Sequence, residues 1–252
     1  MEFRRVGIVG VPPLRIITEL NRSGCRILDL DEPLVNKSIE LSSPWLPRVY
    51  CAILRTVVVN VLHLELDAIY IDVGPGKCDC ALHVATVLEE ILTIPVIRTE
   101  NRDDVPFGTP VCRARIPLLE KFRRITGSVR TGEPAGDFEP CLPEAGFWGV
   151  PPRDFSILEP FPDTTHIYGW TRCMENKTPA DMELEMYCNP EVPTVFFAQS
   201  FCAKTALAGH LARLHPCSLF VDCDVTAGSS ARAKIEAFLE LSVAGKCGGK
   251  DR

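Results

Sequence analysis

The chain has 252 residues, of which 46% are hydrophobic and 24% are charged, and its formal net charge is −6. This length can hold one large domain or two small ones, and the composition is that of a globular protein rather than a disordered one. The acidic balance argues against nucleic-acid binding, which needs a basic face or stripe.

The most apolar stretch is RVYCAILRTVVVNVLHLEL, residues 48–66. Arg55, His63 and Glu65 interrupt it before about 18 apolar residues accumulate, so it predicts a buried helix and no membrane partner. The apolar run near the N-terminus, residues 6–11, is short and is followed by two prolines, which is unlike a signal peptide. We therefore expect a cytoplasmic protein.

Short apolar runs alternate with helical patterns along the chain, which is typical of βαβ units built around a parallel sheet. In the first half we expect strands at residues 6–11, 26–30, 68–73 and 95–98. The helices expected between and after them span residues 14–22, 51–64, 79–92 and 113–125.

Residues 127–145 are dense in glycine, proline and acidic side chains, and they predict a linker. The expected organisation is a first α/β domain over residues 1–126, this linker, a second α/β domain over residues 146–245 and a tail over residues 246–252. In the second domain we expect strands at residues 147–150, 166–168, 194–198 and 218–221, and helices at residues 181–187, 203–214 and 231–241.

The motif G-x-x-G-V-P-P occurs twice, at residues 7–13 and 146–152, at the first expected strand of each half. A cysteine also follows the third expected strand of each half, namely Cys78 and Cys202. These matches predict an internal duplication: two α/β halves, each with a four-stranded, mainly parallel sheet flanked by helices. Open α/β sheets bind ligands beyond the carboxyl ends of their strands, so facing halves would bring Cys78 and Cys202 towards one cleft.

Twelve cysteines are many for a chain without secretion signals, and they fit thiols kept reduced in an anaerobic or reducing cytosol. The sequence contains no C-x-x-C pair, which argues against zinc ribbons and thioredoxin-type redox motifs. Cys78, with Cys80 as its neighbour, follows GPGK at an expected strand-to-helix turn, where helix amides stabilise a thiolate. The alternative is that these cysteines are small buried hydrophobic residues.

Other catalytic patterns are weak. GPGK lacks the first glycine and the Ser or Thr of a Walker motif. The five histidines show no metal-ligand spacing, and no G-x-S-x-G nucleophile elbow is present. The catalytic residues therefore remain unassigned at this point.

The segment LFVDCDVTAGSSARAKIEAFLELS resembles the C-terminal signature of the 2-hydroxyacyl-CoA dehydratase and benzoyl-CoA reductase subunit family. In that signature a strand ending in an acidic residue precedes a loop and a helix of the type R-x-R-x-x-A-F-L-E. The residues that match are Arg232, Ala237, Phe238, Leu239 and Glu240.

Two further segments resemble motifs of the same family. VFFAQSFCAKT is similar to its strand ending in an F-C pair, with Phe201 and Cys202 at those positions. The region from LPRVYC to KCDCALHVATVLEEI is similar to a cysteine-bearing helix followed, one strand later, by C-D at the start of the next helix. Those positions are Cys51, Cys78 and Asp79.

The resemblance implies two flavodoxin-like halves with a [4Fe-4S] cluster between them, bound by Cys51, Cys78 and Cys202 and leaving one iron open. Cys51 is implied by the resemblance alone, and Cys80 is the alternative to Cys78. Thiolate sulfur is the donor that iron–sulfur clusters use, and their potential is tuned by hydrogen bonds and burial. The resemblance also implies a separate ATP-hydrolysing iron–sulfur activator as partner, and a homo- or heterodimer.

The leading hypothesis is an oxygen-sensitive cluster protein acting in ATP-coupled low-potential electron transfer or reductive chemistry. As an enzyme it would be a 2-hydroxyacyl-CoA dehydratase-like lyase or a low-potential reductase component. The second hypothesis is a cluster-free or zinc-bound α/β binding or assembly protein that helps to mature or activate another metalloenzyme.

Overall fold

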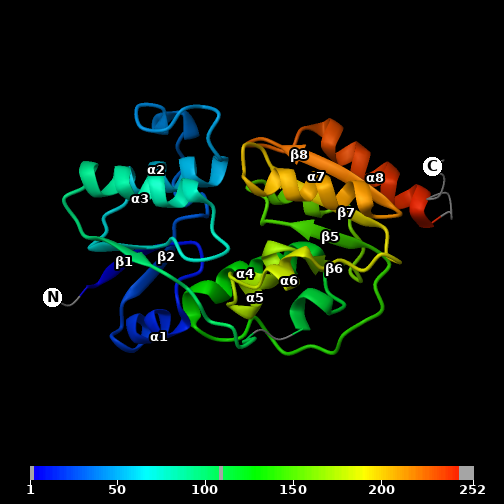
Figure 1. Cartoon of the computed structure of the whole chain (residues 1–252), viewed down its shortest axis with the longest axis horizontal. Coiled ribbons are helices and arrows are strands. Elements are labelled where there is room, and N and C mark those ends of the chain that lie inside the picture. The colour runs from blue at the N-terminus through cyan, green and yellow to red at the C-terminus, as the bar shows by residue number, and fades with distance from the viewer. Residues whose placement is uncertain (1–2, 108–109, 244–252) are drawn as a thin grey trace.

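The structure is a computed structural model that describes residues 3–107 and 110–243. It contains two four-stranded sheets, each entirely parallel and each flanked by helices (Figure 1). The expected tail, residues 246–252, and the last two residues of the expected second domain lie outside the described residues.

The first half forms a doubly wound unit whose strand order is β2-β1-β3-β4. Strand β1 lies inside this sheet and pairs with β2 on one side and β3 on the other. Helices α2 and α3 pack on one face of this sheet, and α1 and α4 pack on the other. Its elements in chain order are β1 (Arg5–Val9), α1 (Leu14–Arg22), β2 (Arg26–Asp29), η1 (Ile39–Ser42), α2 (Ala52–His63), β3 (Ala68–Asp72), α3 (Asp79–Ile91) and β4 (Val96–Thr99).

The second half repeats this plan with the order β6-β5-β7-β8. The expectation of two similar α/β halves with four-stranded parallel sheets is therefore confirmed. The remaining elements are η2 (Pro110–Arg113), α4 (Leu118–Thr131), β5 (Gly146–Gly149), η3 (Phe155–Leu158), β6 (His166–Tyr168), α5 (Trp170–Asn176), α6 (Met182–Met186), β7 (Thr194–Gln199), α7 (Lys204–Leu214), β8 (Ser218–Cys223) and α8 (Ser229–Val243).

The two G-x-x-G-V-P-P copies occupy equivalent turns. The first leads from β1 into α1 and the second from β5 into η3. Gly10 has a φ of +76°, a conformation that favours glycine, and Pro13 caps α1 where no backbone N–H is needed. The repeated motif is thus the first strand-to-helix turn of each half.

Helix α4 differs from its expected span, residues 113–125, and also from the expected linker. It begins at Leu118, directly after Pro117, and ends at Thr131, and its C-cap residue Gly132 adopts the left-handed conformation with φ +66°. Gly127 lies inside the helix, where it is tolerated because Ile125 and Val129 beside it are buried. The first residues of the expected linker are therefore helical.

One hydrophobic core extends through both halves. It includes Val6 and Ile8 of the first sheet, Phe122 and Ile125 of α4, and Phe147 of the second sheet. Helix α4 contacts α1 and β2 on one side and α5 on the other, so it joins the two halves (Figure 1).

A buried lysine strengthens this junction. The Lys121 ammonium donates hydrogen bonds to the carbonyl oxygens of Asp163, at 3.0 Å, and Thr165, at 2.5 Å. Lys121 is fully buried, and burial lowers its pKa to about 8. Its charge is thus held by carbonyl dipoles of the second half.

The loops at the carboxyl ends of the strands also connect the halves. The Asn101 side-chain amide donates to the carbonyl oxygens of Val11, at 3.0 Å, and Lys177, at 3.2 Å. The loop after β3 approaches residue 179 so closely that a Cβ on Gly76 would overlap the carbonyl oxygen of Pro179. Close backbone packing therefore fixes the loop that carries Cys78.

Among the described helices, none combines the length and the apolar character needed to cross a bilayer.

We expect Gly76→Ala to destabilise the fold more than Gly24→Ala. Both glycines have positive φ, +81° and +72°, but nothing lies within 4 Å of a Cβ at Gly24. Gly24→Ala should therefore cost only the left-handed backbone strain, about 1 kcal/mol. Gly76→Ala should cost about 1–3 kcal/mol more because a backbone oxygen must move.

Chemical denaturation of the two variants and the parent chain measures both free energies of unfolding. Equal destabilisation by the two substitutions would contradict the close packing of the loop after β3 against Pro179.

Candidate functional site

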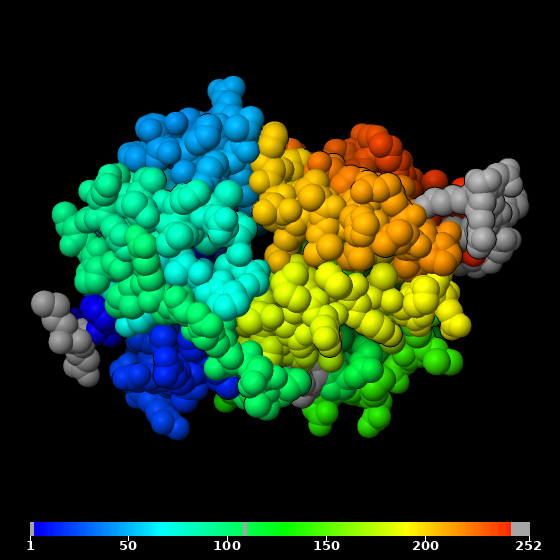
Figure 2. Space-filling view, viewed as in Figure 1, coloured from blue at the N-terminus to red at the C-terminus, as the bar shows by residue number. Residues whose placement is uncertain are grey.

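A pocket of about 580 Å³ lies between the two halves. Its walls come from the carboxyl ends of β1, β2 and β3, from α4, and from the second-half segments that follow β5 and β7. Figure 2 shows the molecule hollowed between the cyan surface of the first half and the orange surface of the second. This is the position at which doubly wound sheets bind ligands.

All three cysteines of the expected ligand set line this pocket. Cys51 is the N-cap residue of α2, Cys78 is the N-cap residue of α3, and Cys202 lies two residues before α7. Each thiol therefore sits at the start of a helix, where backbone N–H groups and the helix dipole favour the thiolate. Two of the cysteines come from the first half and one from the second.

The thiols of Cys51 and Cys202 interact across the two halves, and each shifts the pKa of the other. The interaction with Cys51 lowers the pKa of Cys202 to about 7, and the Lys204 amide and ammonium act in the same direction. The same interaction, together with burial, raises the pKa of Cys51 well above its usual range. The pair thus favours one thiolate, on Cys202, and one proton, on Cys51.

Cys78 and its neighbour Cys80 have different surroundings. Cys78 lines the pocket, and burial raises its pKa, while the Ala81 amide opposes that rise. Cys80 is not part of the pocket lining, and its thiol lies near Tyr50, where, together with burial, it raises the pKa of that hydroxyl. Only the first of the two cysteines therefore faces the same space as Cys51 and Cys202.

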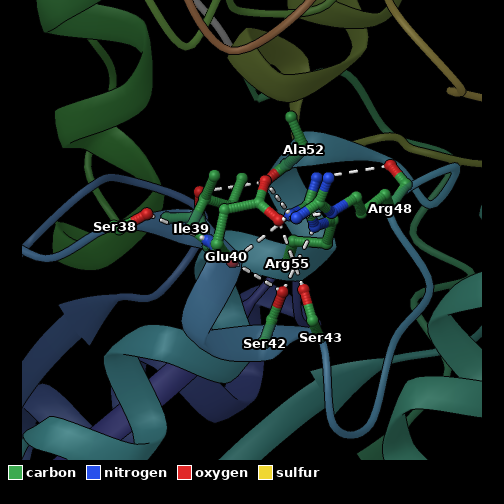
Figure 3. Close-up of polar contacts among 9 residues, drawn as sticks. Ser38, Ile39, Glu40, Ser42, Ser43, Arg48, Ala52 and Arg55 are labelled. Atoms are coloured by element: carbon green, nitrogen blue, oxygen red, sulfur yellow. Dashed lines mark hydrogen bonds and ion pairs between the residues drawn. The ribbon is translucent and has the colours of Figure 1, made fainter.

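A polar network fixes the segment that leads to Cys51 (Figure 3). The buried guanidinium of Arg55, in the second turn of α2, donates to Glu40 at 2.8 Å, to the hydroxyl of Ser42 at 3.2 Å and to the carbonyl oxygen of Arg48 at 3.3 Å. The Arg55 amide donates to the Cys51 carbonyl oxygen at 3.1 Å. The loop before α2 is thereby held against the helix whose first residue follows Cys51.

Cys202 is placed by a tight turn after β7. Its amide donates to the carbonyl oxygen of Gln199 at 2.9 Å, and the preceding Phe201 has a φ of +62°. The Gln199 side chain donates to the carbonyl oxygens of Cys223 and Asp224, which holds the end of β7 against β8. Positive φ is costly for a bulky residue, and such strain is concentrated at functional sites.

Two lysines flank the thiols and share one aromatic ring. The ammonium groups of Lys77 and Lys204 lie 4.4 Å and 4.5 Å from the ring centre of Trp170. Lys204 also forms an ion pair with the fully buried Glu185 and donates to the carbonyl oxygen of Gly76. Positive charge is therefore held next to Cys78 and Cys202 and bridges the two halves.

Three carboxyl groups lie at the carboxyl ends of the strands in the first half. Burial raises the pKa values of Asp29, Asp31 and Asp72, and it raises that of Asp29 furthest. Oδ1 of Asp72 accepts the Asn101 amide at 2.9 Å, whereas its buried Oδ2 has no hydrogen-bond partner. Asp72 lines the pocket with this atom unsatisfied.

Within the described part of the chain, no group of three or more His, Cys, Asp or Glu side chains is close enough together to hold one metal ion. Three thiolates around a single zinc would need sulfur atoms about 3.8 Å apart. Thiolates that bind an iron–sulfur cluster each bond a different iron, so their sulfur atoms lie farther apart than around a single zinc. Cys51, Cys78 and Cys202 all line one cavity, as such a set of ligands requires.

Several pocket residues were not singled out from the sequence. Asp29 and Asp72 end the second and third strands in the segments ILDLD and YIDV, and acidic residues at strand ends were an available signal. Trp170 and the arginines of α4 gave no comparable signal, because their placement depends on how the two halves pack.

We expect Cys202 to be alkylated at lower pH than an ordinary thiol in the metal-free chain. Cys51 lowers the pKa of its thiol, so Cys51→Ala should move the midpoint of alkylation from about 7 towards the usual thiol value of about 8.5. Iodoacetamide labelling over a pH series, read by peptide mass spectrometry, measures the midpoint at each cysteine.

Cys188→Ala is the matched control because Cys188 lies outside the pocket and should leave the Cys202 midpoint unchanged. A midpoint that stays the same or falls in Cys51→Ala would contradict the interaction between the two thiols.

Comparison of the sequence with protein-family models and with curated proteins gives no match. Among solved structures, the structure of MenH from S. aureus aligns with 96% of this chain and 92% of that chain, at 12% sequence identity and a TM-score of 0.19. A TM-score this low carries no argument about fold or function.

Proposed function

We propose that the protein binds a [4Fe-4S] cluster through Cys51, Cys78 and Cys202 and acts in ATP-coupled low-potential electron transfer or reductive chemistry. The observation that carries the proposal is that these three thiols, contributed by both halves, line one pocket. Thiolate sulfur is the usual protein ligand of such clusters.

The surroundings of the thiols fit this assignment. Cys78 is chosen over Cys80 because Cys78 lines the pocket, whereas Cys80 does not and lies near Tyr50. Three thiolates leave one iron of a four-iron cluster without a protein sulfur, and the pocket would give a substrate access to it. When bound, the cluster would supply a low-potential electron and a site that accepts a substrate oxygen.

The charges near the thiols support a negatively charged group. Lys77 and Lys204 hold ammonium groups against Trp170 beside two of the three cysteines. Their attraction would favour the anionic thiolates and offset the charge of a bound cluster. Because Lys204 bonds to both Glu185 and the Gly76 carbonyl, it also keeps the two halves together around the site.

The partners follow from the family resemblance. An ATP-hydrolysing iron–sulfur activator would supply the electron, and a homo- or heterodimer would be the functional unit. A cluster with an open iron is oxidised readily, so the protein would be oxygen-sensitive and would work in an anaerobic cytoplasm. The matching enzyme classes are a 2-hydroxyacyl-CoA dehydratase-like lyase or a low-potential reductase component.

Anaerobic reconstitution with iron and sulfide tests the cluster. We expect roughly four irons and four sulfides per chain in the parent protein. Cys51→Ala, Cys78→Ala and Cys202→Ala should each retain less than about half of that iron, because each removes one ligand. Cys80→Ala and Cys188→Ala are the matched controls and should retain all of it.

Iron and sulfide assays, together with the spectrum of the cluster, give the readout. Absence of stoichiometric iron in the parent chain after reconstitution would overturn the proposal. Stoichiometric zinc in place of iron would favour the alternative, a zinc-bound assembly protein. Loss of the cluster in Cys80→Ala but not in Cys78→Ala would show that the ligand was assigned to the wrong cysteine.

A further inference from the structure

Helix α4 presents two arginines to the same pocket. Arg123, Thr126 and Arg130 all line it, and their spacing of three and four residues places them on one face of the helix. Arg123 is exposed at the rim, whereas Arg130 is half-buried. Arg124 lies between them, is not part of the lining, and forms an ion pair with Glu120 at 2.7 Å.

The two pocket arginines are not held in ion pairs. In the part of the chain that the structure describes, Arg123 and Arg130 form no ion pair. Nε of Arg130 is also buried without a hydrogen-bond partner. Arg130 lies close enough to Asp29 to oppose the rise that burial causes in the pKa of that carboxyl, but the two side chains form no ion pair. Two guanidinium groups at one pocket wall without an ion-pair partner favour an anionic ligand.

The rest of the lining limits what that ligand is. The pocket also has apolar walls, which include Leu34, Leu54, Phe155 and Met174. These apolar walls are unfavourable for a simple inorganic ion. Binding would remove water from the ion, and the ion has no apolar surface to place against the walls in return.

We propose that the pocket binds a small organic carboxylate, whose anionic group is held by Arg123 and Arg130 and whose apolar part lies along the pocket walls. The guanidinium fork suits a planar carboxylate because it can donate two parallel hydrogen bonds. This inference rests on the proposed function in one respect: the carboxylate would be the substrate of the cluster that the same pocket is proposed to bind.

Binding of the fluorescent anion 8-anilinonaphthalene-1-sulfonate to the full-length chain, with hexanoate and hexanamide as competitors, tests this. Hexanoate should displace the probe, and the uncharged hexanamide of the same shape should compete at least about tenfold more weakly. Arg123→Gln and Arg130→Gln should each weaken hexanoate about tenfold.

Arg124→Gln is the matched control, since it removes an adjacent arginine of the same helix that does not face the pocket. It should leave hexanoate competition unchanged. Equal competition by hexanoate and hexanamide, or equal weakening by Arg124→Gln, would overturn the inference. If Arg130→Gln fails to fold by circular dichroism, the exposed Arg123→Gln carries the test.

Iron content measured on the same preparations separates this inference from the proposed function. Arginine-dependent hexanoate binding in a chain that takes up no cluster would overturn the cluster and leave the carboxylate site standing. A chain that takes up a full cluster but binds hexanoate no better than hexanamide would overturn the carboxylate site alone.

Discussion

The packing of α4 between the two sheets is the constraint on which the site depends. This helix buries Phe122, Ile125 and Val129 in a core shared by both halves, and Lys121 ties it to carbonyl oxygens of the second half. Because α4 fixes one sheet relative to the other, the carboxyl ends of their strands border one pocket. An adjacent face of the same helix contributes Arg123 to that pocket, so the helix that joins the halves also shapes the site.

The thiols illustrate how a repeated fold can assemble a site that neither half contains. Each half places a cysteine after its third strand, at the start of a helix, and the first half adds Cys51 at the start of α2. The interaction between Cys51 and Cys202 lowers the pKa of Cys202 and raises that of Cys51. Lys77 and Lys204 add positive charge beside the thiols, which favours negative charge there. This electrostatic arrangement suits a cofactor bound through thiolates, and the unpaired arginines suit an anion beside it.

Local patterns in the sequence predicted most strands and the position of Cys78 and Cys202, because alternation of strands and helices and turns rich in glycine and proline are local signals. Helix α4 was misplaced because residues 127–145 as a group have the composition of a linker, although burial of Ser128 and Val129 keeps the first of them helical. The preference for Cys78 over Cys80 depends on which side chain faces the pocket, and the roles of Trp170 and Arg130 depend on packing between halves. Neither kind of information is present in a local pattern.

The most direct test of the account is a thiol cross-link between the halves. Dibromobimane, which becomes fluorescent when it bridges two nearby thiols, should link Cys51 to Cys202 in the metal-free chain, because these thiols lie close enough to shift each other's pKa values. Mass spectrometry of the linked peptides identifies the pair. Recovery of the Cys51 to Cys202 link is the predicted result. Links confined to cysteines of a single half would contradict a thiol site shared between the two sheets.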